Sequence, residues 1–454
     1  MSRETISYYS TNLKANKVSF SEALLKGLAP DKGLFMPDSI PALDPEEIRD
    51  LKGRTYPEIA FRISRLFLKG EITDTDLRDI VNDAYNFQIP LKKVYNRIYI
   101  MRLDGGPTAS FKDFAARMMG RLMQYFLQKH NRHLNILTAT SGDTGSAIAN
   151  AFYGLENINV VILFPEKEVT DRQRKQMTTL RKNIRIVAVD GKFDDCQALV
   201  KKAFTDDDLA RLNLSSANSI NIGRLLPQSF YYFYAWSQLA SDDERVLFAV
   251  PSGNFGNMMG GLLAMHMGLP VKRFVIATNE NDEVPVYWQT GKYTTIEPSR
   301  NCISNAMNVG HPSNIARVVA LYGGIMDEKG LISKEPDTAR MHKDIYAVSI
   351  SDQTTESTLK NAWDQYKLLL EPHGAAGWAG LHEYLKKHPK DQESLCVCLE
   401  TAHPAKFPEA IRKLIHIEPD LPPSLRDLDK LEESYDHIQN GYASFKSYLL
   451  KRFL

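Results

Sequence analysis

The sequence contains few cysteines, and none is spaced as a metal site or a disulfide framework requires. Only four occur among 454 residues. Cys396 and Cys398 lie two apart in an apolar run, where alternate residues of a strand would point the same way. Cys196 and Cys302 have no partner at metal-ligand spacing. We therefore expect no metal site and a reducing compartment.

An excess of charge of one sign is also lacking. The 56 basic and 55 acidic residues give a net charge of +1, so nothing draws the chain toward nucleic acid or an anionic membrane surface. No apolar run approaches the ~20 residues of a membrane helix. The start, Met-Ser-Arg-Glu-Thr, has no signal-peptide core. We expect a cytoplasmic protein without a nucleic-acid or membrane partner.

From about residue 95 onward, short runs rich in Val and Ile alternate with amphipathic segments, which is typical of βα units on a mostly parallel sheet. Two such series, before and after about residue 220, predict an α/β fold with two lobes and a cleft between them. Each lobe would hold a mostly parallel twisted sheet flanked by helices. The expected strands are 98–103, 135–140, 159–164, 185–189, 245–250, 273–278, 346–350 and 395–400, and the expected helices include 196–212, 226–239, 257–267 and 375–387.

The first ninety-odd residues have a different pattern. Helical stretches at 20–28 and 56–68 are broken by Pro37, Pro41 and Pro45, so we expect an accessory domain. The predicted division of the chain is an N-terminal domain at 1–94, a first lobe at 95–220, a second lobe at 221–415 and a charged, helical C-terminal tail at 416–454.

Lys112 stands where an expected strand gives way to an expected helix. Gly-Gly-Pro at 105–107 breaks the strand, and apolar residues then recur at spacings of three and four from Phe111 onward. A cation in the first turn of a helix opposes the macrodipole, so this lysine is poorly placed for stability alone. Desolvation there would lower the pKa of its amine and favour attack on a carbonyl. The alternative is a solvated surface lysine after a turn.

Two glycine-bearing loops each follow an expected strand and precede an expected helix. Residues 140–146, Thr-Ser-Gly-Asp-Thr-Gly-Ser, offer hydroxyls and helix N–H groups suited to a carboxylate or phosphate. In residues 251–257, Pro-Ser-Gly-Asn-Phe-Gly-Asn, two glycines and the amides between them could cradle a phosphate dianion. Neither loop has nucleotide P-loop or dinucleotide spacing, and each alone could be a tight turn.

A reactive lysine, a phosphate cup and a second polar loop in one chain together favour pyridoxal 5′-phosphate. Its aldehyde needs an amine, its phosphate needs a cup, and its ring nitrogen needs a partner. Residues 400–407, Glu-Thr-Ala-His-Pro-Ala-Lys-Phe, follow the last expected strand. Thr401 could bond the ring nitrogen without forcing it to stay protonated. His403 is a second candidate, beside the alternative of a turn histidine satisfied by the backbone.

These motifs carry a resemblance to a known family. The lysine, loop and strand-end motifs resemble those of the tryptophan-synthase-β-like group of fold-type II pyridoxal-phosphate enzymes. Three N-terminal runs, at 8–12, 18–23 and 27–37, resemble one branch of that group, the threonine synthase family. The similarity extends from the start of the chain to about residue 415, and the motifs that carry it lie at 107–113, 140–145, 251–257 and 400–407.

The resemblance implies conversion of O-phospho-L-homoserine and water to L-threonine and phosphate, the last step of threonine biosynthesis. It implies that Lys112 is the Schiff-base lysine and the shuttling base, and that Thr401 faces the ring nitrogen. Asp143 takes the place near the ring's 3′-oxygen where the wider group commonly has asparagine. The resemblance further implies that the cofactor phosphate is held by Gly253, Asn254, Phe255, Gly256 and Asn257, and the substrate carboxylate by Ser141 and Thr144.

The substrate phosphate has four candidate partners that flank the expected cleft and carry suitable donors. Each also has a plain structural role as its alternative. They are Arg102, Asn218, Asn221 and Arg224. We expect the enzyme to be a monomer or a homodimer.

Three other functions stay open from the sequence. A phospho-lyase on the same scaffold would turn O-phosphohomoserine or phosphothreonine into 2-oxobutyrate, ammonia and phosphate. A threonine or serine dehydratase would use the same lysine, although the N-terminal match counts against it. A non-catalytic ligand-binding protein could keep the fold, but the intact lysine, cup and ring partner argue against it.

Overall fold

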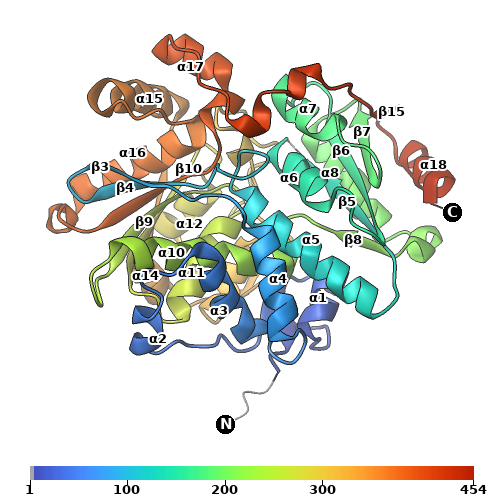
Figure 1. The fold of residues 1–454 in the computed structure, drawn as a ribbon, viewed down its shortest axis with the longest axis horizontal. Coiled ribbons are helices and arrows are strands. Elements are labelled where there is room, and N and C mark those ends of the chain that lie inside the picture. Colours follow the sequence, from blue (N-terminus) through green and yellow to red (C-terminus); the bar gives the residue numbers. More distant parts are fainter. Residues whose placement is uncertain (1–4, 141, 454) are drawn as a thin grey trace.

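The protein is built around two sheets (Figure 1), and the computed structural model describes residues 5–140 and 142–453. In spatial order the six-stranded sheet contains β13 (Ile345–Ser349), β10 (Val271–Thr278), β9 (Val246–Pro251), β14 (Cys396–Glu400), β4 (Ile98–Arg102) and β3 (Leu91–Tyr95). The five-stranded sheet contains β15 (Asp436–Ile438), β7 (Ile184–Val189), β6 (Ile158–Pro165), β5 (Leu134–Ala139) and β8 (Leu214–Ser216).

Neighbouring strands run parallel throughout both sheets except for β3 and β4, which are antiparallel. The expected α/β fold with two mostly parallel sheets is therefore confirmed, and so are all the strands that the sequence predicts. Such strands are buried on both faces and read as continuous apolar runs, which makes them easy to locate.

Both faces of each sheet are covered by helices. On the six-stranded sheet, α16 (Pro372–Lys387) packs against one face, and α11 (Gly256–His266) packs against the other, beside α10 (Phe230–Leu239). Cys396 and Cys398 point to the α16 side together, as expected for alternate residues of a strand. On the five-stranded sheet, α8 (Phe193–Ala203) covers one face, while α5 (Lys112–Lys129) and α6 (Asp143–Phe152) lie on the other.

The single helix expected at 196–212 is wrong, because the chain breaks it after α8. A short 3-10 helix, η1 (Asp207–Leu212), follows, and the Asp206 side chain caps it by accepting from Asp208 N–H at 3.0 Å. Lys446 and Tyr442 from the end of the chain also bond this carboxylate. The expected helix at 226–239 likewise begins with a 3-10 turn, η2 (Leu226–Ser229), before α10.

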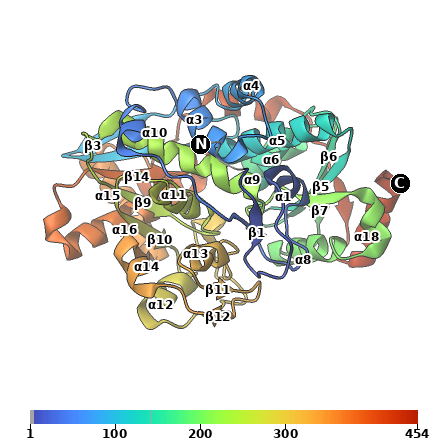
Figure 2. The same ribbon diagram turned by 90° about the horizontal axis from the view of Figure 1, so that it is seen from below.

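The N-terminal region packs below both sheets in Figure 1, and Figure 2 views its blue elements from that side. Its strands β1 (Tyr8–Ser10) and β2 (Phe35–Pro37) pair antiparallel. Helix α3 (Tyr56–Leu68) contacts α10, and α4 (Asp74–Ala84) contacts α5. The accessory N-terminal domain is thus confirmed, while the limits of all four proposed domains stay a prediction. The region also contains α1 (Phe20–Lys26) and α2 (Pro45–Arg49).

The remaining elements connect or wrap these layers. They are α7 (Asp171–Thr178), α9 (Ile222–Leu225), α12 (Glu283–Thr290), η3 (Asn305–Met307), α13 (Ile315–Leu321), β11 (Ile325–Met326), β12 (Ile332–Lys334), α14 (Thr338–Asp344), α15 (Asp352–Tyr366), η4 (Pro389–Asp391), η5 (Pro404–Lys406), α17 (Pro408–Ile415), η6 (Pro423–Leu425), η7 (Leu428–Lys430) and α18 (Tyr442–Phe453). Within the described parts of the chain, no helix has the length and apolar character needed to span a membrane.

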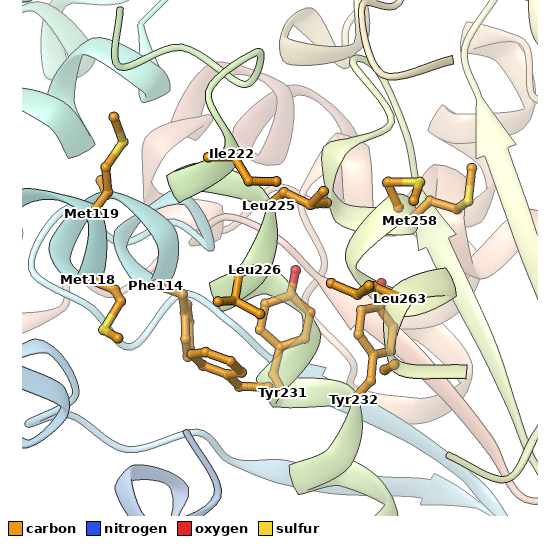
Figure 3. Close-up of a cluster of buried hydrophobic side chains, with 14 of the residues drawn as sticks. Phe114, Met118, Met119, Ile222, Leu225, Leu226, Tyr231, Tyr232, Met258 and Leu263 are labelled. Carbon is orange, nitrogen blue, oxygen red and sulfur yellow. The ribbon is translucent and has the colours of Figure 1, made fainter. Parts of the chain in front are cut away.

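A buried cluster joins the helices that lead into the expected site (Figure 3). Helix α5 lies on one side, α11 lies on the other, and α9, η2 and α10 stand between them. Because α5 begins with Lys112 and α11 begins at the second glycine loop, this packing fixes the two loops relative to each other. The labelled members are Phe114, Met118, Met119, Ile222, Leu225, Leu226, Tyr231, Tyr232, Met258 and Leu263.

Candidate active site

The predicted site motifs follow the carboxyl ends of strands. The lysine loop follows β4, the segment at 400–407 follows β14 and the loop at 251–257 follows β9, and these three strands are neighbours in one sheet. The loop at 140–146 follows β5 in the other sheet. Ligands of open α/β sheets bind beyond the carboxyl ends of the strands, so this placement is that of a ligand site.

The lysine loop is held by the segment that follows β14. Phe111 N–H donates to the Thr401 carbonyl at 2.8 Å, and His403 N–H donates to the Ala109 carbonyl at 3.0 Å. Ala109 has a left-handed backbone with a φ of 55°, a conformation that costs a residue with a side chain free energy and persists only where neighbours enforce it. These bonds therefore fix the backbone just before Lys112.

Asp113 closes the same loop from inside. Its carboxylate accepts from Thr108 N–H at 2.9 Å and from the Thr108 hydroxyl at 2.6 Å. Burial raises the pKa of Asp113 to about 6, although the Thr108 bonds oppose this. A Cβ on Gly106 would lie 2.4 Å from Asp113 Oδ2, so the loop needs glycine at 106 because a side chain would displace this carboxylate.

Lys112 is the first residue of α5, as expected, and its side chain is 14% exposed. Its Nζ lies 3.8 Å from Asp143 Oδ2. Burial lowers the pKa of Lys112, while Asp143 opposes the change. A buried amine of this kind reaches its neutral, nucleophilic form more easily than a solvated lysine does. The alternative of a solvated surface lysine is therefore wrong.

Asp143 begins α6, where the helix N-terminus favours a negative charge. Its Oδ1 accepts from Lys406 Nζ at 2.7 Å and from Gln173 Nε2 at 2.9 Å. Burial alone would raise the pKa of Asp143, but Lys406 and Lys112 together hold it well below its ordinary range. The sequence motif contains Lys406 without indicating this role, and Gln173 carries no sequence signal.

The second glycine loop presents an amide whose donor is free. Tyr231 and Tyr232 donate to Asn257 Oδ1 at 2.6 and 2.7 Å, which orients the side chain. Asn257 Nδ2 is buried and has no partner among the described residues. Phe255 has a left-handed φ of 59°, and the Asn254 carbonyl accepts from Asn314 Nδ2 at 2.9 Å. Contacts within the protein thus fix the shape of the loop.

The four candidates for holding a substrate phosphate fall into two pairs. Arg102 is paired with Asp104, and Asn221 bonds the Leu24 and Ser216 carbonyls while capping α9, so both have structural roles. Arg224 Nη1 donates to Ala217 at 2.9 Å, but its Nε is buried without a partner in the described chain, and Asn218 Oδ1 is likewise unpartnered. Burial lowers the pKa of Arg224 to about 10, so it stays cationic at neutral pH.

Thr401 lies beside two buried acids. Its hydroxyl donates to Glu371 Oε1 at 3.4 Å, and Glu371 N–H donates to Glu400 Oε1 at 2.8 Å. Burial, and then the charge of Glu371, raise the pKa of Glu400 well above its ordinary value. His403 Nδ1 accepts from Ala405 N–H at 3.1 Å, which is the backbone-satisfied turn histidine that the sequence left as an alternative.

The last two predicted residues lie in the first loop. Ser141 falls outside the described residues. Thr144 occupies the first turn of α6 and is half-buried. The binding roles of all the predicted site residues stay predictions.

Comparison with known proteins decides the family. A family model described as "Pyridoxal-phosphate dependent enzyme" matches residues 84–400, and two others, "Threonine synthase N terminus" and "Threonine synthase, C-terminal", match residues 7–85 and 374–449. Threonine synthase of Haemophilus influenzae is 41% identical over 451 residues, which cover 98% of this chain and 99% of that protein. The chain belongs to the threonine synthase family.

Solved structures of threonine synthases agree with this assignment. Pyridoxal-phosphate-bound threonine synthase from Brucella melitensis has a TM-score of 0.91 and 34% identity, covering 99% of this chain and 100% of that one. The enzyme from Escherichia coli has a TM-score of 0.88 and 36% identity over 98% and 99% of the two chains. This chain is therefore a threonine synthase that depends on pyridoxal phosphate, and the comparisons support this function rather than the phospho-lyase alternative.

Proposed function

We propose that the substrate is O-phospho-L-homoserine, which the enzyme and water convert to L-threonine and phosphate at the site around Lys112. The observation that carries this proposal is the buried Lys112 amine, 3.8 Å from Asp143 at the carboxyl edge of both sheets. Its depressed pKa suits a group that must first attack a carbonyl and then accept protons.

The residues present fit pyridoxal phosphate. An orphaned buried donor, Asn257 Nδ2, next to a helix N-terminus is suited to a phosphate. We assign the cofactor phosphate to the loop of Gly253, Asn254, Phe255, Gly256 and Asn257. Thr401 would face the ring nitrogen, and Asp143 the 3′-oxygen. When bound, the cofactor spreads the negative charge that develops when a substrate carbon loses a proton.

The chain's own groups would supply the proton transfers and the binding. Lys112 Nζ would take protons from the substrate's α- and β-carbons and return protons to its γ- and α-carbons. Phosphate would leave from the γ-carbon, and the hydroxyl of water would add at the β-carbon, which would give threonine. Ser141 and Thr144 would hold the substrate carboxylate. The Arg224 guanidinium, whose Nε has no partner among the described residues, would attract the substrate phosphate.

The test is one incubation with O-phospho-L-homoserine in which phosphate, threonine and 2-oxobutyrate are measured together. We expect phosphate and threonine in equal amounts. Release of 2-oxobutyrate in step with phosphate would instead establish the phospho-lyase reaction. The Lys112→Ala variant should lose threonine formation and also the absorbance of the lysine-bound cofactor, because the nearby Lys406 amine is already bonded to Asp143 and to the Thr108 carbonyl. If the variant kept both, Lys112 would not be the essential lysine.

We also propose that the protein works in the cytoplasm, as a monomer or a homodimer. The four cysteines are free and buried, which suits a reducing compartment. Size-exclusion chromatography coupled to light scattering would establish the number of chains.

A further inference from the structure

Lys406 is a second buried lysine beside the site. It ends η5, and its side chain is fully buried. Its Nζ donates to Asp143 Oδ1 at 2.7 Å and to the Thr108 carbonyl at 3.0 Å. A buried ammonium group is tolerated only where its charge and its donors are both compensated. These two partners supply that compensation for Lys406.

The pairing determines what Asp143 offers to Lys112. Asp143 Oδ1 is occupied by Lys406 and Gln173, and only Oδ2 faces Lys112. At 3.8 Å, the Lys112 amine is beyond hydrogen-bond range of Oδ2. Lys112 therefore lies near a carboxylate whose charge is already balanced by another cation.

The charged groups around Lys112 come from several elements. The anions are Asp143 from α6 and Glu371 at the start of α16, while the cations are Lys406 from η5 and Arg224 from α9. On its own helix the nearest charged group is Asp113, which is occupied by Thr108. Without Lys406, the anions near Lys112 would outnumber the cations, and the Lys112 amine would hold its proton more strongly.

We propose that Lys406 is a positioning residue that neutralises Asp143, so that the Lys112 amine is not drawn into a hydrogen bond with that carboxylate and stays available as a nucleophile. This inference rests on the proposed role of Lys112. The Asp143–Lys406 ion pair also connects α6, on the five-stranded sheet, to the segment that follows β14 in the six-stranded sheet.

The test measures how readily Lys112 reacts as the pH changes. The full-length protein is stripped of cofactor, and the rate at which pyridoxal phosphate is captured is followed from pH 6 to 10 by the absorbance of the lysine-bound form. The midpoint is the pH at which the Lys112 amine reacts at half its maximal rate. Acetylation of Lys112 by acetic anhydride, followed by mass spectrometry, measures the same midpoint without the cofactor. Wild type is compared with Lys406→Met, Asp143→Asn and the double variant.

Lys406→Met should raise the midpoint by about one pH unit and slow capture at pH 7.5 about tenfold, because one unit of pKa is a factor of ten in the neutral amine. Asp143→Asn should lower the midpoint, because the Lys406 charge is then unopposed. The double variant should return the midpoint to near that of wild type. Lys413→Met, which removes a lysine whose side chain is 75% exposed on the next helix, is the matched control and should change nothing.

An unchanged midpoint in folded Lys406→Met would overturn the proposal. If that variant does not fold, the proposal is tested by comparing Asp143→Asn with the double variant. Equal midpoints for those two variants would also overturn the proposal. A wild-type enzyme that formed no threonine while these shifts occurred would contradict the proposed function and leave the role of Lys406 intact.

Discussion

Gly253 and Gly256 lie three residues apart in one loop, yet their surroundings differ. A Cβ on Gly253 would lie 2.8 Å from the Ala306 carbonyl oxygen and 2.9 Å from Met307 Cα, both of them backbone atoms. The nearest atom to a Cβ on Gly256 is Gln228 Nε2 at 3.4 Å, which is ordinary contact. Only Gly253 is therefore required by the fold itself.

Alanine substitutions should separate the two roles. Gly253→Ala should cost about 1–3 kcal/mol of the free energy of unfolding, because the backbone at 306–307 must move. Gly256→Ala should change stability by less than about 0.5 kcal/mol and still weaken cofactor binding about tenfold, because a methyl group would narrow the cup. Urea unfolding and a cofactor titration measure the two effects. Unchanged cofactor affinity in Gly256→Ala would count against the phosphate cup.

The placement of the candidate site residues could be predicted where it depends on short motifs. Lys112, Asp143 and the glycine loops each follow a strand and precede a helix, so their placement can be read locally. Lys406 and Gln173 could not be assigned, because their roles arise only when segments far apart in sequence meet at Asp143. Arg102 and Asn221 carry donors suited to a phosphate. In the folded chain these donors already bond Asp104 and the Leu24 carbonyl, which the sequence does not indicate.

Among the elements, the C-terminal segment departs most from its sequence pattern. We expected a helical tail, but the chain first adds a parallel strand, β15, to the edge of the five-stranded sheet beside β7. At three residues, β15 is too short to give a pattern of its own. Helix α18 then packs on α8 and buries Phe445 and Leu449 completely. The tail is thus part of a hydrophobic core.

Phe445→Ala should loosen this tail. Removing a fully buried phenylalanine costs about 3–5 kcal/mol. This cost is large compared with the free energy needed to unfold a single strand and helix locally at the end of a chain. We expect limited proteolysis to release the tail much faster in this variant. Lys451→Ala, an exposed change on the same helix, is the control. Equal cleavage rates in the two variants would show that α18 is held by other contacts.

At the scale of the whole molecule, Arg317 joins three regions. This arginine is fully buried on α13, and no carboxylate bonds it within the described chain. It donates to the carbonyls of Phe35 at 3.2 Å and Ile220 at 2.6 Å, and to Asn314 Oδ1 at 2.7 Å. Burial lowers the pKa of Arg317 to about 9, which still leaves it charged at neutral pH. The N-terminal domain, the segment before α9 and the cup are thus linked through one side chain.

Arg317→Met should destabilise the protein by about 3 kcal/mol or more, because several buried carbonyls lose their donor at once at ~1–3 kcal/mol each. It should also weaken cofactor binding, since Asn314 supports the Asn254 carbonyl. Arg340→Met, which removes an arginine whose side chain is 55% exposed, should cost no more than about 1 kcal/mol. Urea unfolding and cofactor titration measure both effects. If the two variants had the same free energy of unfolding and the same cofactor affinity, this role of Arg317 would be refuted.

The division into two sheets could be predicted, but the membership of individual strands could not. Strand β4 stands early in the sequence and immediately before Lys112, yet it pairs with β14. Strand order depends on which apolar edges meet after the chain has turned through several helices, and no local pattern records that choice.

The bond between Lys406 and Thr108 joins residues 298 positions apart. Because a chain is synthesised from its N-terminus, the lysine loop leaves the ribosome long before the residues that hold it. An incomplete chain that ends before residue 400 carries Lys112 but lacks the segment that fixes its loop. Because the site of such a chain is incomplete, we expect the cofactor to bind only after the ribosome has synthesised residues 400–407.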